Sequence, residues 1–145
     1  MRFRIAALFF ATVLLPACLM GQSSTQDVSK FTGVWRGQFD NLPGVDIVLT
    51  DEGGQLHGAM LFYLHQRANA NAPYTSTPGL PEPMFNLRIE GQTLHFQVSH
   101  RRAHPPGSLD DAPKTFHLKL TGPDQAELMN ESGGAPVVTM KRSDE

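Results

Sequence analysis

The sequence predicts an all-β domain, an eight-stranded antiparallel up-and-down meander that is closed or nearly closed into a small barrel. Three observations lead to this prediction. Apolar and polar residues alternate with a period of two in most of the chain, which is typical of antiparallel strands. The alternating runs are separated by short segments rich in turn-forming residues, and the 13 glycines and 11 prolines suit such a chain. No helical pattern is long enough to cross between parallel strands.

The composition narrows the classes of function. A length of 145 residues allows one domain. Lysine and arginine total 12 against 14 acidic residues, and this near balance argues against a nucleic-acid partner. The single cysteine cannot form an internal disulfide, and no cluster of cysteine and histidine has the spacing of a structural zinc site. The sequence therefore predicts no cofactor.

Residues 1–21 are predicted to be a signal peptide rather than part of the fold. Arg2 and Arg4 precede the apolar run Ile5–Leu15. This run is shorter than the about 20 residues that cross a membrane as a helix, but it fits the apolar segment of an export signal. We therefore expect the protein to be exported.

The segment Leu15–Cys18 resembles the bacterial lipobox. That resemblance implies that Cys18 carries a lipid as the mature N-terminus, and Leu19 after it implies the outer membrane. Ordinary cleavage after Ala17 or Gly21, giving a periplasmic or secreted protein, remains an alternative. The only membrane contact that the sequence predicts is through such a lipid anchor.

After the leader, residues 22–29 are polar and predict a tether, and residues 30–145 form the single barrel domain. Within each predicted strand one set of alternate side chains is apolar, as with Phe116 and Leu118 on either side of His117. The eight predicted strands are, in order, Val34–Phe39, Val45–Leu49, Leu56–His65, Phe85–Glu90, Leu94–Ser99, Thr115–Leu120, Ala126–Met129 and Pro136–Lys141.

The connections predict two unlike ends. In a meander, alternate connections lie at the same end of the sheet. The tight turns Asp51–Gly54, Glu90–Gln92 and Gly122–Gln125 therefore gather at one end, and the long loops Gln66–Pro83 and Arg102–Pro113 at the other. Long loops in a compact domain are commonly functional, so the loop end is the predicted binding end.

The segment Phe31–Gly37 carries Gly-x-Trp-x-Gly at the start of the first strand. It resembles the opening of lipocalins and other calycins, and is also similar to the small β-domain that accompanies exported bacterial α/β-hydrolases. The resemblance implies that Trp35 closes one barrel end and that a basic residue of the last strand, Lys141 or Arg142, packs across it through a cation–π contact.

The loop end gathers cationic and aromatic residues that suit the acidic head of an amphipathic molecule. These rim residues are Tyr63, His65, Arg67, His100, Arg101, Arg102 and His104. Below them, the large aromatics Phe62, Phe85, Phe96 and Phe116 are predicted to face inward. An eight-stranded barrel is either filled by such side chains or holds one small ligand, and the sequence leaves both open.

Three histidines, His57, His95 and His117, fall on polar strand faces. If Phe96 lies opposite Leu118, His95 is diagonal to His117 at about 7–8 Å. No third ligand is indicated, so the sequence predicts no metal site and interprets these histidines as surface residues.

No pattern predicts catalysis. Gly107-Ser108 lacks the nucleophile elbow of hydrolases, and His100–His104 runs into prolines that exclude a zincin helix. The predicted function is an exported, non-catalytic barrel that binds a small apolar or amphipathic molecule with an anionic head. The alternative is a filled barrel that docks an envelope or secreted enzyme. Leu56–His65, apolar on both faces, predicts a second covered surface for either a loop or such a partner.

Overall fold

The computed structural model describes residues 27–99, 112–131 and 136–143. The predicted signal peptide with Cys18 lies outside these residues. So do four of the predicted rim residues, His100, Arg101, Arg102 and His104. Within the part that is described, no helix has the length and apolar character needed to cross a membrane.

A short 3-10 helix, η1 (Val28–Phe31), precedes the strands, and Val28 already packs against the core although the predicted tether extends to residue 29. The described strands are β1 (Gly33–Phe39), β2 (Leu42–Glu52), β3 (Gln55–Gln66), β4 (Thr75–Pro78), β5 (Glu82–Glu90), β6 (Thr93–Val98), β7 (Lys114–Gly122), β8 (Gln125–Asn130) and β9 (Val138–Ser143).

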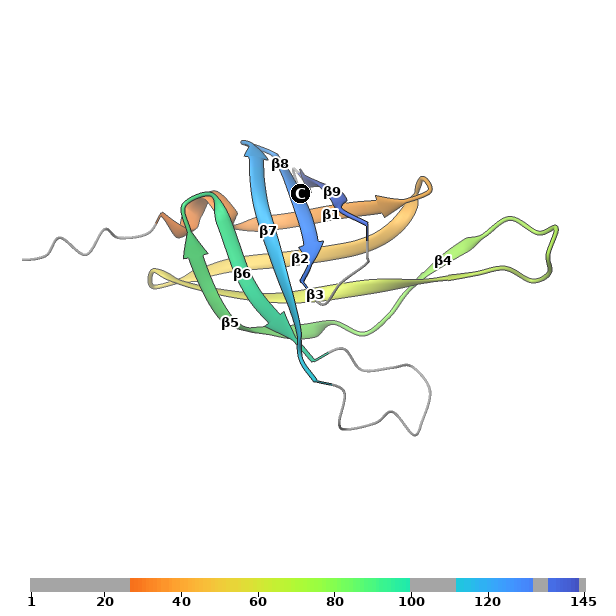
Figure 1. Cartoon of the computed structure of the whole chain (residues 1–145), viewed down its shortest axis with the longest axis horizontal. Helices are drawn as coiled ribbons and strands as arrows, with labels where there is room; N and C mark the ends of the chain where they lie inside the picture. The colour runs from red at the N-terminus through yellow and green to blue at the C-terminus, as the bar shows by residue number, and fades with distance from the viewer. Residues whose placement is uncertain (1–26, 100–111, 132–135, 144–145) are drawn as a thin grey trace, which may run out of the picture.

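Eight of these strands form a closed antiparallel barrel (Figure 1). Their order in the sheet is β2-β1-β9-β8-β7-β6-β5-β3, and the additional pairing of β2 with β3 joins the two ends. Neighbours in sequence are neighbours in the sheet, apart from the inserted β4 and the pairing of β9 with β1 that completes the ring. The predicted fold class is confirmed, and the closed barrel is compatible with a lipocalin-like fold.

The ninth strand corrects the sequence prediction. Residues 66–83 were expected to form a loop, but β4 pairs with the end of β3, from Tyr63↔Pro78 to Gln66↔Thr75. Figure 1 shows this hairpin as an arm that extends beyond the barrel. The sequence of β4, Thr-Ser-Thr-Pro, has no apolar alternation because both of its faces are largely exposed, so the pattern that marks the other strands is absent.

One predicted inward-facing aromatic is on the outside. Asn86 has φ of 54°, and the pairing of β5 with β6 shifts register between Phe85 and Arg88. This β-bulge reverses the alternation, so that Met84 is buried and Phe85 lies opposite Gln97, an outward-facing residue between buried Phe96 and Val98. The prediction that Phe85 faces inward is wrong.

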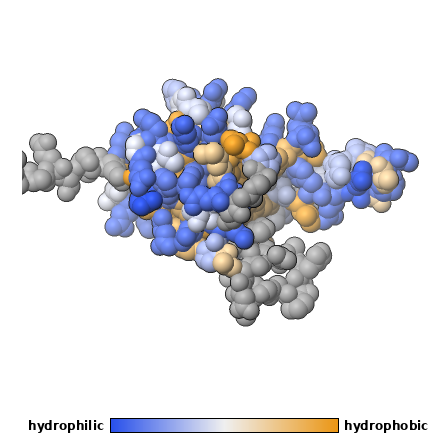
Figure 2. Space-filling view, viewed as in Figure 1, coloured by the Kyte–Doolittle hydropathy of each residue, from blue (hydrophilic) through white to orange (hydrophobic). Residues whose placement is uncertain are grey.

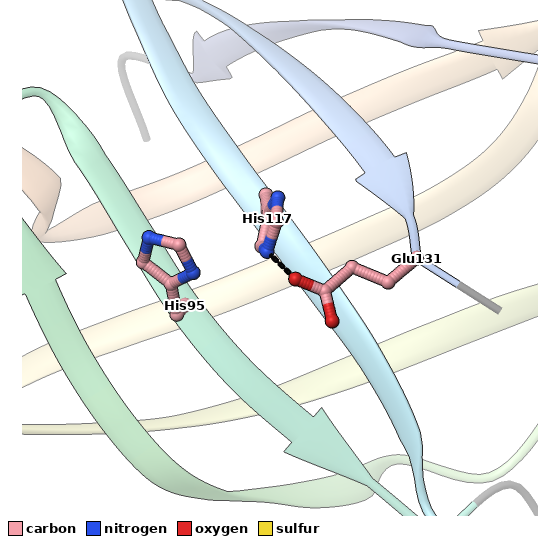
Figure 3. Close-up of side chains that lie close together, drawn as sticks. All are labelled: His95, His117 and Glu131. Atoms are coloured by element: carbon pink, nitrogen blue, oxygen red, sulfur yellow. Dashed lines mark ion pairs between the residues drawn. The ribbon is translucent and has the colours of Figure 1, made fainter.

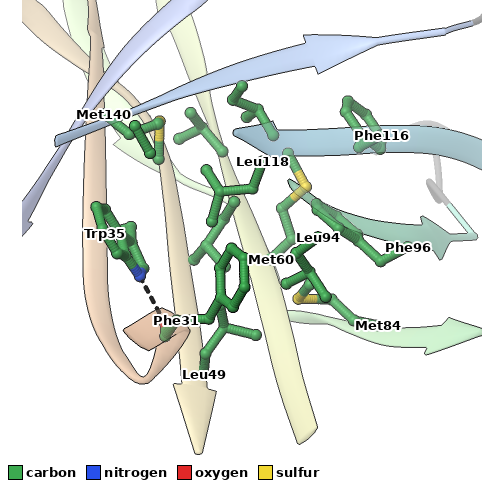
Figure 4. Packing of buried hydrophobic residues seen from close by; sticks show 14 of the residues in the cluster. Phe31, Trp35, Leu49, Met60, Met84, Leu94, Phe96, Phe116, Leu118 and Met140 are labelled. Atoms are coloured by element: carbon green, nitrogen blue, oxygen red, sulfur yellow. Dashed lines mark hydrogen bonds between the residues drawn. The ribbon is translucent and has the colours of Figure 1, made fainter. Parts of the chain in front are cut away.

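The end of the barrel near η1 is closed by packed side chains (Figure 4). Phe31 and Trp35 are fully buried, and Trp35 Nε1 donates a hydrogen bond to the Phe31 carbonyl at 2.8 Å. The Arg142 guanidinium lies 4.6 Å from the Trp35 ring centroid and donates to the carbonyls of Thr32 and Lys30. Of the two candidates for this contact, Arg142 makes it, whereas Lys141 is exposed.

The tight turns gather around this closed end. Lys30 Nζ donates to the Gly91 carbonyl in the β5–β6 turn at 2.6 Å. Arg142 also reaches the Pro123 carbonyl in the β7–β8 turn, and forms an ion pair with Asp124 at 3.4 Å. The opposite end of the barrel is therefore the end that carries the longer connections.

Candidate binding site at the loop end of the barrel

The loop end of the barrel is hollow. A cavity of about 300 Å³, the lower end of the range for small-molecule sites, lies between the ends of the strands. Its lining comes mainly from apolar side chains. The lining residues are Phe39, Val45, Met60, Phe62, Lys114, Phe116, Leu128, Asn130, Pro136 and Val138. Among the described residues, packed side chains therefore fill the half of the barrel next to η1, and the cavity lies in the other half.

Three of the four predicted inner aromatics face into the barrel, two in the cavity wall and one in the core below it. Phe62 and Phe116 line it, with ring centroids 6.0 Å apart. Phe96 lies beneath Phe116 in a stacked arrangement at 5.7 Å and is 1% exposed. Because Phe96 is covered on all sides, it forms part of the packed core rather than of the cavity wall.

Two polar residues stand among the apolar ones, Lys114 and Asn130. Lys114 begins β7 on the same face as Phe116 and Leu118, and Asn130 ends β8 on the same face as Leu128. Asn130 lies opposite Phe116 in the sheet, so both polar groups occupy the last inward positions before the loops. An ammonium group at the mouth of an apolar cavity suits a ligand whose charged end is an anion.

Sequence reasoning missed Lys114, although a signal for it was present. Lys114 is two residues before Phe116, and side chains at this spacing in a strand share a face. Continuing the inward-facing set by one step towards the loop would have identified Lys114, and the same step from Leu128 identifies Asn130.

Three predicted rim residues, Tyr63, His65 and Arg67, lie on the arm or at its base and do not line the cavity. Tyr63 donates a hydrogen bond to Asp46 Oδ2 at 3.0 Å, and His65 Nε2 is 2.7 Å from the Pro43 carbonyl. Arg67 lies over the Tyr74 ring at 5.1 Å and donates to a loop carbonyl. Their alternation explains this placement, since inward-facing Phe62 puts Tyr63 and His65 on the outer face.

The pKa of Tyr63 reflects these surroundings. Burial raises the pKa above the ordinary value of 10.0, and the hydrogen bond to Asp46 and the negative charge of that residue raise it further. Arg36 acts in the opposite direction. The phenol is therefore held neutral as part of the outer wall, which is a structural role rather than a site for an anion.

An acidic residue also lies inside the barrel. Glu82 begins β5 opposite Met60 and is 8% exposed. It has an interaction partner and does not line the cavity. Lys114 is therefore the charged group among the described residues of the cavity wall.

The surface around the arm is partly hydrophobic. Figure 2 shows a mostly hydrophilic face, with hydrophobic patches where the barrel meets the arm. Leu64 on the arm and Leu80 after it are 48% and 83% exposed. Within the predicted covered surface Leu56–His65, β4 pairs with the edge of β3 from Tyr63 onward, and Leu64 stays exposed.

Comparison with protein-family models finds no family that matches this chain, and neither the curated proteins nor the solved structures contain a match. The class of protein that the fold and the cavity define is a small antiparallel β-barrel with one closed end and one hollow end.

Proposed function

We propose that the protein is a binding barrel that takes a small apolar molecule with an anionic head into its loop end. The observation that carries this proposal is the cavity of about 300 Å³, with its apolar wall and Lys114 at the mouth. The apolar part of the ligand replaces water in contact with Phe62, Phe116 and Val138. The head group stays near Lys114, where it is paired without being fully removed from solvent.

The first experiment offers the purified protein a mixture of fatty acids and detects retained ligand by native mass spectrometry. We expect one bound molecule per chain, with short and medium chains preferred because the cavity is small. No retained ligand at any chain length or pH would contradict the proposal.

A matched pair of probes distinguishes the contribution of the charged head to binding from that of the apolar chain. Decanoate and its methyl ester share the apolar chain, but only decanoate carries a charge. Substitution Lys114→Met is expected to weaken decanoate binding about 5–10-fold, since a partly exposed ion pair contributes about 1 kcal/mol. Binding of the ester should not change. Lys119→Met, an exposed lysine on the same strand, is the control and should leave both affinities unchanged.

A second variant tests the cavity itself. Val138→Phe places a larger side chain in the wall and should weaken decanoate and its ester alike, because the volume available to the chain falls. Equal binding by this variant and the unsubstituted protein would place the ligand elsewhere. Circular dichroism verifies that the barrel is intact.

We also propose that the protein is exported and anchored through Cys18. The support is the leader sequence, with its apolar run and its resemblance to a lipobox. Labelling cells with a fatty-acid analogue tests this proposal, and the label should be lost in Cys18→Ser. A soluble, unlabelled, cleaved protein would instead support ordinary cleavage.

The second candidate function is a protein-interaction module, and the exposed Leu64 and Leu80 favour it. In this case the arm docks an envelope or secreted enzyme. The experiment captures a stoichiometric partner from an extract. Loss of this partner in the double variant Leu64→Ser and Leu80→Ser, with its retention in Val138→Phe, would support docking through the arm rather than through the cavity.

A further inference from the structure

A group of metal-ligand side chains lies on the outer face of the barrel, away from the cavity. His95 on β6 is directly opposite His117 on β7, because Phe96 pairs with Phe116 rather than with Leu118. The register with Phe96 opposite Leu118 is therefore wrong, and the two histidine rings are in contact, with centroids 4.2 Å apart. Glu131, the residue after β8, lies beside them (Figure 3).

From this arrangement we propose a binding site for a divalent transition-metal ion of the zinc class, with His95, His117 and Glu131 as ligands. One ligand atom from each residue lies within 4.8 Å of the other two. Bonds to zinc of about 2.0–2.2 Å require ligand atoms about 3.3–3.5 Å apart, so the group needs to contract by somewhat more than 1 Å. Glu131 is half exposed and ends in a flexible carboxylate, which can supply most of this movement.

The ligand atoms already converge. Glu131 Oε1 forms an ion pair with His117 Nε2, an atom that is shielded from solvent and has no hydrogen bond of good geometry among the described residues. The backbone amide of Glu131 donates to the Thr115 carbonyl at 2.9 Å, which holds this residue against β7. Figure 3 shows one ring nitrogen of His95 turned towards His117 and Glu131.

The second nitrogen of His95 is also held. Its Nε2 lies 3.3 Å from Glu90 Oε2 at the end of β5, which leaves Nδ1 to face His117. Metal-bound histidines usually donate their other ring N–H to a carboxylate or carbonyl, which fixes the ring and strengthens the ligand. Glu90 is placed to do this. Two adjacent protonated imidazoles would repel each other, whereas two neutral ones can share an ion.

The ion would be reachable from solvent. The side chains of His95 and His117 are 19% and 21% exposed, and that of Glu131 is 45% exposed. Three protein ligands leave one position of a tetrahedral ion open to water. Two histidines with one carboxylate suit Zn²⁺ better than Mg²⁺ or Ca²⁺, which prefer oxygen ligands.

The test titrates Zn²⁺ into the purified full chain, after treatment with a chelator, by isothermal titration calorimetry. We expect one saturable site and a melting temperature that rises with Zn²⁺ concentration. Co²⁺ in its place should give the visible absorption of a four-coordinate site. Each of His95→Ala, His117→Ala and Glu131→Ala should weaken Zn²⁺ binding at least tenfold and remove the Co²⁺ bands. Glu90→Gln should weaken it about tenfold while the bands persist.

His57→Ala is the matched control, because His57 is an exposed outward-facing histidine on β3, outside this group. It should bind Zn²⁺ as the unsubstituted protein does. Absence of saturable Zn²⁺ binding would overturn the proposal. An equal loss of Zn²⁺ affinity in His57→Ala and His117→Ala would also overturn it. Glu131→Ala changes an exposed side chain and keeps the test decisive if a histidine variant fails to fold.

Discussion

Arg142 connects three separate parts of the chain at the closed end. Its guanidinium stacks on Trp35 and bonds to the carbonyls of Lys30, Thr32 and Pro123. Arg142→Ala removes these contacts together and should lower the free energy of unfolding by about 2–4 kcal/mol. Urea denaturation of the full chain measures this change.

The neighbouring Lys141→Ala provides the control for this prediction. Lys141 is exposed, so its loss should change stability by less than about 0.5 kcal/mol. If both variants lose the same stability, the proposed role of Arg142 in closing the barrel is wrong.

Tyr63 supplies a prediction about pH. Burial and, after it, the contact with Asp46 raise the pKa of this phenol above 10.0. The folded state therefore keeps its proton when the unfolded state loses it, and the stability that Tyr63 contributes is present below pH 10 and decreases as pH rises through the folded pKa. Absorbance titration, with Tyr63→Phe to identify the signal, measures the pKa, and Asp46→Asn should lower it. Ionisation of Tyr63 at or below its ordinary value would contradict this prediction.

At the scale of the elements, the bulge in β5 depends on Asn86. Its φ of 54° is tolerated by asparagine and glycine but costs a β-branched residue about 1–2 kcal/mol. Asn86→Val should therefore lower the urea midpoint clearly. Asn86→Gly should change it little, because glycine adopts this conformation freely even though the hydrogen bond to Gln97 is lost.

An equal decrease of the urea midpoint in the two Asn86 variants would contradict this prediction. It would show that the hydrogen bond to Gln97, rather than the backbone conformation, stabilises the bulge.

The same bulge shows which parts of the fold could be predicted from the sequence alone. Period-two alternation located all eight barrel strands, because each buries one face in a common core. It placed Phe85 on the wrong side, since a bulge inserts one residue without a strong sequence signal. It also missed β4, which pairs through its backbone while its side chains stay exposed.

The candidate sites were only partly predictable for a related reason. The cavity-lining Phe62 and Phe116 follow from alternation, and Lys114 follows from extending it. The contact of His95 with His117 depends on the register between β6 and β7, and a shift of two residues keeps the same faces inward. Glu131 follows a third strand, β8, so only the folded barrel shows that it lies beside the histidines.

At the scale of the whole molecule, the barrel divides into a packed half and a hollow half. Phe31, Trp35 and Arg142 close the end near η1, while Phe96 forms the boundary below the cavity. The proposed function therefore places stability and ligand binding at opposite ends of one sheet. Substitutions around Trp35 should act on unfolding, and substitutions around Lys114 should act on ligand affinity.

The location of bound ligand tests this division most directly. Methyl NMR spectra of the full chain, recorded while decanoate is added, report on both halves at once. We expect saturable shifts at Val45, Met60, Leu128 and Val138, which line the cavity, and none at Leu49 or Leu94 in the packed core. No saturable shift at the methyl groups of these four cavity residues, or shifts confined to exposed Leu64 and Leu80, would contradict a ligand site inside the barrel.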